Sequence, residues 1–191
     1  MSAVLSQKQI SSLHTYHQIE EASEVRHEYH DGEIIAMSGG TIDHALIIRN
    51  LIILLHIAFQ DSDFSVFGGD LRIWIPEHNR GLYPDLSVFN GEVILNNDRR
   101  DEVINPCWIF EVLSDSTEAY DRGQKFRFYR SIPNFNNYFL VSQTEPLIEH
   151  YQRTDNDRWL FSTKQGLDRI LELPNNRSIS LSEIYKGLKF N

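Results

Sequence analysis

Apolar residues gather in short runs along this chain, and one run, residues 106–114, has the length of a fully buried strand. This run contains a single carboxylate, Glu111. A buried carboxylate without a partner costs about 3–5 kcal/mol, so Glu111 needs a cation, a metal ion or a proton beside it. A second apolar run, residues 83–89, carries Asp85. The pattern therefore predicts two strands that each present one acid.

The remaining periodicity predicts helices and further strands. Helical signals extend over residues 6–27 and 118–131, and the second of these helices should turn Phe126 and Tyr129 inward. From 42 to 60, apolar residues recur on one helical face, which predicts a helix that packs on a sheet, with Asp43 as its N-cap. Strands are expected at residues 33–37, 64–67, 70–75, 138–141, 147–153 and 158–163, a short helix at 181–186, and polar surface at 91–105.

This order of elements is typical of an α/β fold with a mixed central β-sheet flanked by helices. The length of 191 residues suits one domain with a sizeable core. We expect a single domain over residues 1–191. It would comprise N-terminal helices at about 6–27, a core at about 28–155, and C-terminal strands with a short helix at 156–191.

Charge and composition narrow the function. The net charge of -9 and pI near 5.3 argue against a passive DNA-binding protein, which normally carries a basic surface. They argue less against a nuclease, because its carboxylates would bind cations. The single cysteine, Cys107, lies in the apolar run, so we expect an inert core thiol and no disulfide framework.

Neither a secretory nor a transit signal is evident at the N-terminus. The longest apolar stretch, residues 45–59, is interrupted by polar side chains and is too short to span a bilayer. The sequence therefore predicts a cytoplasmic protein without a membrane partner.

The two acids suggest a metal site. Alternate residues of a strand share a face, so Asp85 and Glu111 can converge on one divalent cation if their strands are neighbours. Oxygen donors suit Mg²⁺ or Mn²⁺, and such an ion can activate water for phosphodiester hydrolysis. Lys125 is the candidate for a further cation at this site, and Asp121 lies four residues before it on the same helical face.

The chain resembles the Uma2 family of restriction-endonuclease-like proteins, which belong to the PD-(D/E)XK nuclease superfamily and are abundant in cyanobacteria. The resemblance covers most of residues 25–155. Its ordered set of matching segments is more specific than any one of them. The segments are residues 28–33, Ser38, His44, 70–72, 83–88, 106–114, 121–125 and Tyr129, with 138–153 as a family-like ending.

This resemblance implies a restriction-endonuclease-like fold with Asp85 and Glu111 as metal ligands and the Val112 carbonyl as a third. The superfamily tripeptide would place lysine at position 113, where this chain has Leu113. In related proteins that lysine can lie on the following helix, a role that Lys125 fits. The family pattern also adds three supporting positions, namely Glu28, His44 and Asp70.

Structural interpretations compete at each of these positions. Glu111 could form a buried ion pair with an Arg or Lys, and Lys125 could be an exposed residue paired with Asp121. Glu28 lies between His27 and His30, which raises zinc binding, although the spacing matches no familiar zinc pattern. Asp70 could pair with Arg72 or cap a turn.

Three functions remain open at this point. The first is a Mg²⁺- or Mn²⁺-dependent endonuclease acting on DNA, with Asp85 and Glu111 holding the metal and Lys125 assisting. The second is a catalytically inactive module that keeps the nuclease fold for binding or assembly. The third is a hydrolase of a small phosphoester. A homodimer is expected for the endonuclease, because two-fold symmetry suits cutting two strands.

Overall fold

The computed structural model of the protein describes residues 10–174 and 176–190, which form two six-stranded sheets and one two-stranded sheet. The elements in chain order are α1 (Leu13–Ala22), β1 (His27–His30), β2 (Glu33–Ala36), α2 (Ile42–Phe59), β3 (Phe64–Gly68), β4 (Arg72–Ile75), η1 (Pro76–His78), β5 (Arg80–Leu82), β6 (Leu86–Asn90), β7 (Leu95–Asn96), β8 (Arg99–Val103), β9 (Trp108–Val112), α3 (Glu118–Tyr120), η2 (Asp121–Lys125), α4 (Phe126–Tyr129), β10 (Asn137–Val141), β11 (Leu147–Arg153), β12 (Trp159–Gln165), β13 (Ile170–Leu173), β14 (Arg177–Ser180) and α5 (Leu181–Ile184).

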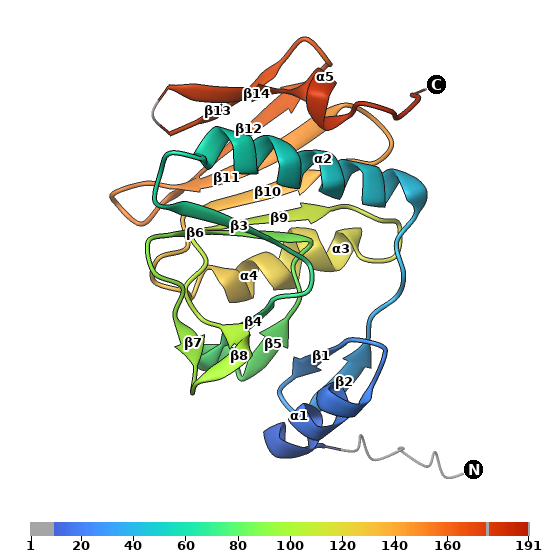
Figure 1. Cartoon of the computed structure of the whole chain (residues 1–191), viewed down its shortest axis with the longest axis vertical. Helices are drawn as coiled ribbons and strands as arrows, with labels where there is room; N and C mark the ends of the chain where they lie inside the picture. The colour runs from blue at the N-terminus through green and yellow to red at the C-terminus, as the bar shows by residue number, and fades with distance from the viewer. Residues whose placement is uncertain (1–9, 175, 191) are drawn as a thin grey trace, which may run out of the picture.

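The larger scaffold is the main sheet, with strand order β12-β11-β10-β9-β6-β3. Its strand β9 lies antiparallel to β6 and parallel to β10, so the sheet is mixed. Helix α2 crosses one face, and the α3–η2–α4 segment lies on the other (Figure 1). The mixed α/β class expected from the sequence is confirmed, and its strands are shared between two large sheets.

Strand β9 divides two hydrophobic cores. Trp108, Phe110 and Val112 pack in the core beneath α2. Ile109 and Leu113 pack in the opposite core, with the aromatic residues of α4. This alternation follows the two-residue period of a strand, and it places Glu111 on the α4 side.

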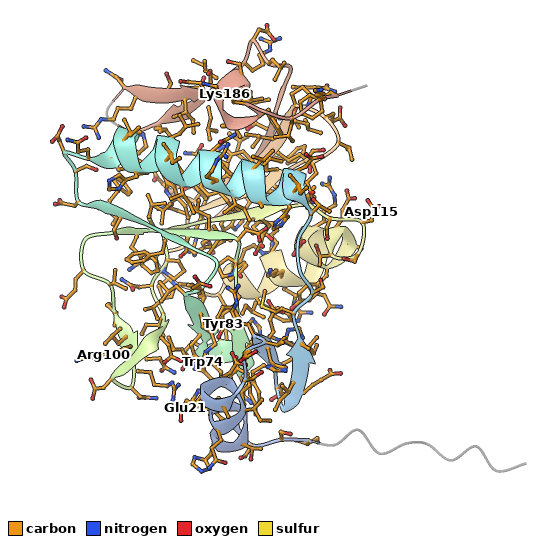
Figure 2. The ribbon with its side chains drawn as sticks, turned by 45° about the vertical axis from the view of Figure 1, so that its right-hand side comes forward. Glu21, Trp74, Tyr83, Arg100, Asp115 and Lys186 are labelled. Carbon is orange, nitrogen blue, oxygen red and sulfur yellow. The ribbon has the colours of Figure 1, made fainter. Side chains whose placement is uncertain are left out.

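The second sheet, the N-terminal sheet, has strand order β2-β1-β5-β4-β8-β7. It contains a fully buried arginine, Arg72, whose Nε lies 2.5 Å from Glu102 Oε2. Tyr83 and Tyr16 hydroxyls accept from Arg72 Nη1 at 3.0 and 3.3 Å, and Glu20 Oε2 lies 3.5 Å from that nitrogen. Charged and phenolic groups therefore fix α1 against this sheet, where Tyr16 also packs near Trp74, the residue labelled in Figure 2.

The C-terminal strands β13 and β14 form a hairpin, and with α5 they cover part of the core beneath α2. Asn50 of α2 donates to the carbonyls of Ile184 and Lys186 at 2.9 Å each. Helix α2 is the one helix among the described residues long and apolar enough for a membrane span by composition. Its apolar residues Ile47, Leu51, Leu55 and Phe59 are buried in the core beneath it, whereas Ile42, Ile53 and Ile57 are exposed.

Several expected elements differ in the structure. The helix expected over 6–27 is α1 alone within the described residues, because β1 begins at His27 to pair with β2, and residues 6–9 lie outside the described part. Thr41, rather than Asp43, caps α2 through its hydroxyl. Residues 83–85 precede β6 instead of belonging to it.

Two further expectations are corrected. The polar stretch 91–105 is not all surface, because β8 buries Glu102 against Arg72 and buries Val103 in the core. The helix over 118–131 is present, but residues 121–125 are π-helical and it ends at Tyr129. Phe126 and Tyr129 do point inward as predicted, and Cys107 is buried. The single-domain organisation remains a prediction.

Candidate metal and phosphodiester site

Asp85 and Glu111 lie side by side because β6 and β9 are neighbours. Leu86 pairs with Phe110, so the residue before Leu86 falls opposite Glu111. The Asp85 amide donates to Glu111 Oε2 at 3.4 Å, and the Val112 amide donates to Asp85 Oδ2 at 2.7 Å. The end of one strand and the interior of the other thus place two carboxylates at one point.

Lys125 reaches the same point from the helix that follows β9. Its Nζ lies 2.9 Å from Glu111 Oε1 and 3.5 Å from Asp121 Oδ1. The side chains of Lys125 and Glu111 are 8% and 3% exposed, so the ion pair is buried. Leu113, at the position expected for lysine, packs in the core with α4 instead. The π-helical turn that contains Lys125 is of a type often found at functional sites.

Glu28 joins this group from the N-terminal sheet. Its Oε1 lies 3.8 Å from Lys125 Nζ and accepts from the Tyr83 amide at 3.3 Å. Its Oε2 lies 2.8 Å from His30 Nε2, and the Tyr120 hydroxyl is 3.3 Å from that nitrogen. Strand β1 therefore carries one acid and one imidazole to the edge of the site.

His44, in the first turn of α2, contacts Asp85, the other proposed metal ligand. Its Nε2 lies 3.2 Å from Asp85 Oδ2. Burial alone would lower the pKa of His44, but the hydrogen bond and charge of Asp85 outweigh it, and the pKa is raised. The main chain of Val112 contributes to the same shift. His44 therefore tends toward a cation next to one of the two proposed metal ligands.

The cluster has more acids than cations. Three carboxylates, those of Glu28, Glu111 and Asp121, surround one ammonium group, that of Lys125, and Asp85 adjoins Glu111. Burial raises the pKa of Glu111 well above its ordinary value, and the carboxylates of Asp121 and Asp85 add to the rise against the opposing charge of Lys125. Burial likewise raises the pKa of Asp121. A further positive charge nearby would stabilise the ionised forms of Glu111 and Asp121.

In two other members of the cluster, Glu28 and Lys125, the pKa shifts in the direction that favours the charged form. Burial alone would raise the pKa of Glu28, but Lys125 and His30 outweigh it and the pKa falls. Burial alone would lower the pKa of Lys125, but the carboxylates of Glu111, Glu28 and Asp121 raise it well above its ordinary value. Lys125 is therefore a cation at neutral pH.

The donor set fits a magnesium-like ion better than zinc. Within the described residues, Asp85 Oδ1 accepts no hydrogen bond, and Glu111 Oε2 accepts only the long one from Asp85. No group of three or more His, Cys, Asp or Glu side chains in the described part is arranged to hold a metal ion. Two carboxylates with surplus negative charge suit Mg²⁺, which keeps several waters, whereas zinc sites need three or four protein ligands.

These residues line one open cleft of about 890 Å³. Both proposed metal ligands, Lys125, Glu28 and His44 all lie on its walls. The Ser38–Gly39–Gly40 segment and residues 112–117 form further parts of its rim. A substrate can therefore reach the acids and the lysine together.

The structure does not bring Asp70 to this cleft. Its side chain is 95% exposed and pairs with Arg26 at 2.6 Å. The zinc arrangement is likewise not assembled, because His27 turns to Glu20 while His30 turns to Glu28 on the other face of β1.

Sequence reasoning missed two residues of the site. Tyr83 contacts the cluster through its main chain, donating to Glu28 and accepting from Lys125 Nζ at 3.5 Å. Tyr129 donates its hydroxyl to Glu111 Oε1 at 3.3 Å, whereas the helical pattern predicts only that it faces inward. A main-chain role leaves no signal in the side-chain pattern. For Tyr129, the available signal was its position one helical turn after Lys125.

Comparisons with known proteins identify the family of this chain. The model of the Uma2 family, described as "Putative restriction endonuclease", matches residues 13–189. The uncharacterized Synechocystis protein slr1290 is 38% identical over 177 residues, which cover 92% of this chain and 91% of that protein. A second Synechocystis protein, sll1609, is 34% identical over 169 residues, covering 88% and 96%.

A solved structure agrees in fold. It is the crystal structure of "a putative nuclease belonging to DUF820" from Anabaena variabilis, with a TM-score of 0.68 and 17% sequence identity. The likeness covers 85% of this chain and 91% of that one. The resemblance seen in the sequence is thus confirmed. This chain belongs to the Uma2 family of restriction-endonuclease-like proteins.

Proposed function

We propose that this protein is a Mg²⁺- or Mn²⁺-dependent endonuclease that hydrolyses DNA phosphodiester bonds in the cleft. The observation that carries the proposal is the convergence of Asp85, Glu111 and Lys125, which come from three separate segments, with Lys125 Nζ 2.9 Å from Glu111 Oε1. The family description supports the reaction class.

Each residue has a distinct part in this proposal. Asp85 and Glu111 would hold the ion, with the Val112 carbonyl as a third oxygen donor. When bound, a divalent ion stabilises charge on a phosphoryl oxygen and makes water a better nucleophile. Lys125 keeps one Glu111 oxygen in place and supplies a fixed positive charge beside the scissile phosphate. Tyr129 and the Tyr83 main chain orient Glu111, Glu28 and Lys125 through hydrogen bonds.

Supporting roles follow from position. His44 would orient Asp85 from the other side of the cleft, and Glu28 and Asp121 would keep Lys125 aligned. Asp70 is assigned no part, because it lies outside the cleft.

The test is cleavage of supercoiled plasmid DNA with Mg²⁺ or Mn²⁺. A metal ligand supplies several kcal/mol of transition-state stabilisation, so Asp85→Asn and Glu111→Gln should each lower the rate by at least about 100-fold. Asp70→Asn is the matched control, because it removes an equivalent acid outside the cleft and should leave the rate unchanged. Equal rates in wild type and in the Asp85→Asn/Glu111→Gln double variant would overturn the proposal.

A catalytically inactive module with the same fold is the alternative. The observation that favours it is that Lys125 already neutralises one oxygen of Glu111, while no group of three ligating side chains is arranged within the described residues. Calorimetric titration with Mn²⁺ separates the two functions. The endonuclease requires saturable binding that Asp85→Asn abolishes, and the module predicts none.

We also infer that the enzyme acts as a homodimer, since cleavage of both strands of a duplex suits two-fold symmetry. Strand β12 is an edge of the main sheet and exposes Leu160 and Phe161, which supports a contact there. Light scattering of the purified chain distinguishes a dimer from a monomer.

A further inference from the structure

Within the described part of the chain, the half-buried Arg80 of β5 has no carboxylate partner and its guanidinium makes no hydrogen bond. Its Cζ lies over the Phe128 ring, 4.1 Å from the centroid. Its Nε is buried without a partner, whereas both terminal nitrogens are open to solvent. The guanidinium is therefore held by an aromatic ring and offers its outer edge to a ligand.

Three other buried or half-buried cations are already held by carboxylates. Lys125, Arg72 and Arg122 each lie close to a carboxylate oxygen, at 2.9, 2.5 and 2.7 Å. An anion that approached one of these groups would compete with the acid already bound to it. Arg80 can bind an anion without that competition.

Strand pairing places Arg80 beside the wall of the cleft. Arg80 lies directly opposite His30 in the antiparallel pair of β5 with β1, so both side chains are on the same face of the N-terminal sheet. His30 lines the cleft, as does Tyr120, whose ring stacks on the His30 ring with centroids 5.6 Å apart. Burial raises the pKa of Tyr120, and the charge of Arg80 acts against that rise. The three side chains are therefore neighbours at one edge of the cleft.

The hydroxyl proton of Tyr120 has no acceptor among the described residues. His30 Nε2 lies 2.8 Å from Glu28 Oε2 and 3.3 Å from the Tyr120 hydroxyl. An ionised carboxylate can only accept, and the pKa of Glu28 is lowered, so Nε2 carries a proton and donates it to Glu28. A protonated Nε2 cannot accept from Tyr120. The hydroxyl is therefore free to donate to a ligand in the cleft.

These two donors suit a phosphate group. The planar fork of a guanidinium matches two phosphate oxygens, and hydroxyl groups commonly donate to phosphates in protein–DNA contacts. Successive phosphates of one DNA strand rise by about 3.4 Å along the helix axis. A strand whose scissile phosphate lies at Lys125 must therefore place neighbouring phosphates against the walls of the cleft.

We propose that Arg80 and Tyr120, here called the phosphate clamp, bind a non-scissile phosphate of the DNA strand held in the cleft. Arg80 supplies charge and Tyr120 supplies a hydrogen bond, and together they fix where the strand enters the site. This inference rests on the proposed nuclease function. It also gives an acidic protein a local contact for DNA, apart from the metal ligands.

The test is the binding of a short fluorescent DNA duplex, measured by anisotropy with Ca²⁺ in place of Mg²⁺, at NaCl concentrations between about 50 and 200 mM. Arg80→Gln should weaken binding at least about tenfold. It should also lower the slope of log K against log salt by about 0.9, because one phosphate contact is lost. Tyr120→Phe should weaken binding about tenfold and leave the slope unchanged, because no charge is removed.

Arg158→Gln is the matched control. Arg158 is an exposed arginine in the turn between β11 and β12, beyond the Trp108 end of β9, whereas Glu111 lies toward the other end of that strand. Its loss removes the same charge from the chain but should change neither the affinity nor the salt slope. Far-ultraviolet circular dichroism shows whether each variant is folded. If Arg80→Gln does not fold, Tyr120→Phe decides, and a variant that binds like wild type overturns the inference.

The inference is also overturned if wild type binds no DNA, or if Arg80→Gln and Arg158→Gln bind it alike. A site for free phosphate would instead give saturable calorimetric binding of inorganic phosphate that Arg80→Gln abolishes, with equal DNA affinity in both proteins, and that result overturns it too. Failure of the nuclease function looks different. DNA would then bind through Arg80 and Tyr120 but would not be cleaved with Mg²⁺ or Mn²⁺.

Discussion

At the scale of single residues, the Lys125–Glu111 ion pair is buried in the protein core. Burying its two charges costs stability. Both partners are almost completely buried, and two more acids face the same ammonium group. A pair of this kind contributes little net stability, yet removal of one partner leaves the other charge buried and unpaired. Stability and the proposed function therefore depend on the same few atoms.

The first prediction concerns this pair. Lys125→Met should lower the free energy of unfolding by about 3–5 kcal/mol, because Glu111 and its neighbouring acids lose their cation. Urea unfolding at pH 7 measures the change. Lys125→Met/Glu111→Gln should recover part of the loss. A Lys125→Met variant as stable as wild type would contradict burial of the ion pair.

The second prediction concerns His150 and pH. Its pKa is about 4 in the folded protein and 6.5 ordinarily, so between these values the unfolded chain binds a proton that the folded chain does not. Stability due to His150 is thus complete above pH 6.5 and is lost as the pH falls toward 4. In His150→Gln, which keeps a hydrogen-bond donor, urea unfolding at pH 7, 6 and 5 should show a weaker fall. If the free energy of unfolding fell equally with pH in both proteins, the lowered pKa of His150 would be refuted.

At the scale of elements, the sequence predicted what local periodicity encodes. Helix α2 and strand β9 have strong apolar patterns, and both were predicted close to their observed bounds. The short strands β1, β5, β7, β8, β13 and β14 were missed, because each is too brief or too polar to show a period. Glu102 looks like a surface residue until Arg72, thirty positions earlier, is placed beside it.

The residues of the candidate site likewise divide into those that the sequence pattern predicts and those that it does not. The convergence of Asp85 and Glu111 was predicted on the condition that their strands are neighbours; β6 and β9 are neighbours, although Asp85 lies just before β6. Lys125 and Asp121 lie on one side of their helix, as their spacing predicted, with Lys125 Nζ 3.5 Å from Asp121 Oδ1, but the π-helical turn that contains them was not predicted. The role of Tyr83 could not be predicted, since it acts through main-chain atoms whose position depends on β5 and β6 together.

The third prediction compares two glycines. Gly123 lies in the π-helical turn, where an added Cβ would have nothing within 4 Å, so Gly123→Ala should raise stability by about 0.5–1 kcal/mol. Gly32 has a φ of +97° and an added Cβ would lie 2.5 Å from the Ile10 side chain, so Gly32→Ala should destabilise the protein. Thermal unfolding of both variants checks this pair. Equal changes in melting temperature for the two variants would show that the local backbone conformation does not determine the effect of the substitution.

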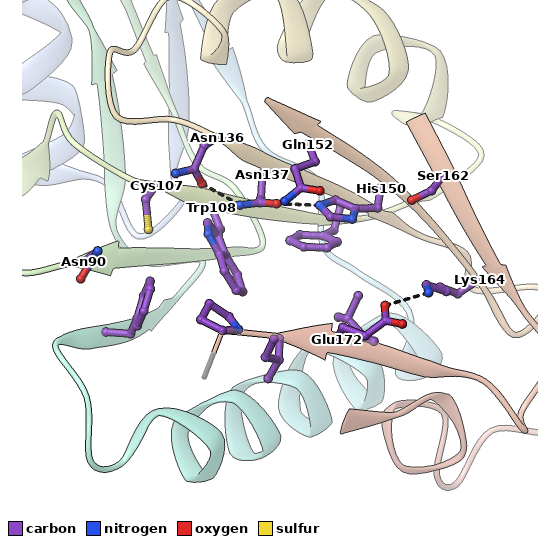
Figure 3. A pocket seen from close by; sticks show the side chains of 15 residues that line it. Asn90, Cys107, Trp108, Asn136, Asn137, His150, Gln152, Ser162, Lys164 and Glu172 are labelled. Carbon is purple, nitrogen blue, oxygen red and sulfur yellow. Dashed lines mark hydrogen bonds and ion pairs between the residues drawn. The ribbon is translucent and has the colours of Figure 1, made fainter. Parts of the chain in front are cut away.

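At the scale of the whole molecule, the protein has two hollows that share no lining residue. The cleft gathers acids and a lysine, whereas the second hollow is lined by amide side chains, by His150 and by the Lys164–Glu172 ion pair (Figure 3). The overall charge of -9 is partly the consequence of the first of these sites and of the buried acids around Arg72. Net charge alone therefore says little about whether DNA can approach the cleft once cations are bound.

The fourth prediction belongs to this scale. If the folded protein alone binds Mn²⁺, an ion concentration one hundred times the Kd should stabilise it by about 2.7 kcal/mol. The melting temperature should rise with Mn²⁺ in wild type and in Asp70→Asn, but not in Asp85→Asn. A rise in all three proteins would point to binding elsewhere on the acidic surface.

The contact between α1 and Arg72 limits how far the chain can be shortened. Glu20 of α1 lies near the buried guanidinium and also accepts the Tyr83 hydroxyl at 2.7 Å. A fragment that began after residue 22 would lose Glu20 and Tyr16, open the Arg72 side chain to water and free the residue whose main chain aligns Glu28 and Lys125. Helix α1 should therefore resist proteolytic removal in the folded protein, and a minimal active fragment must include it.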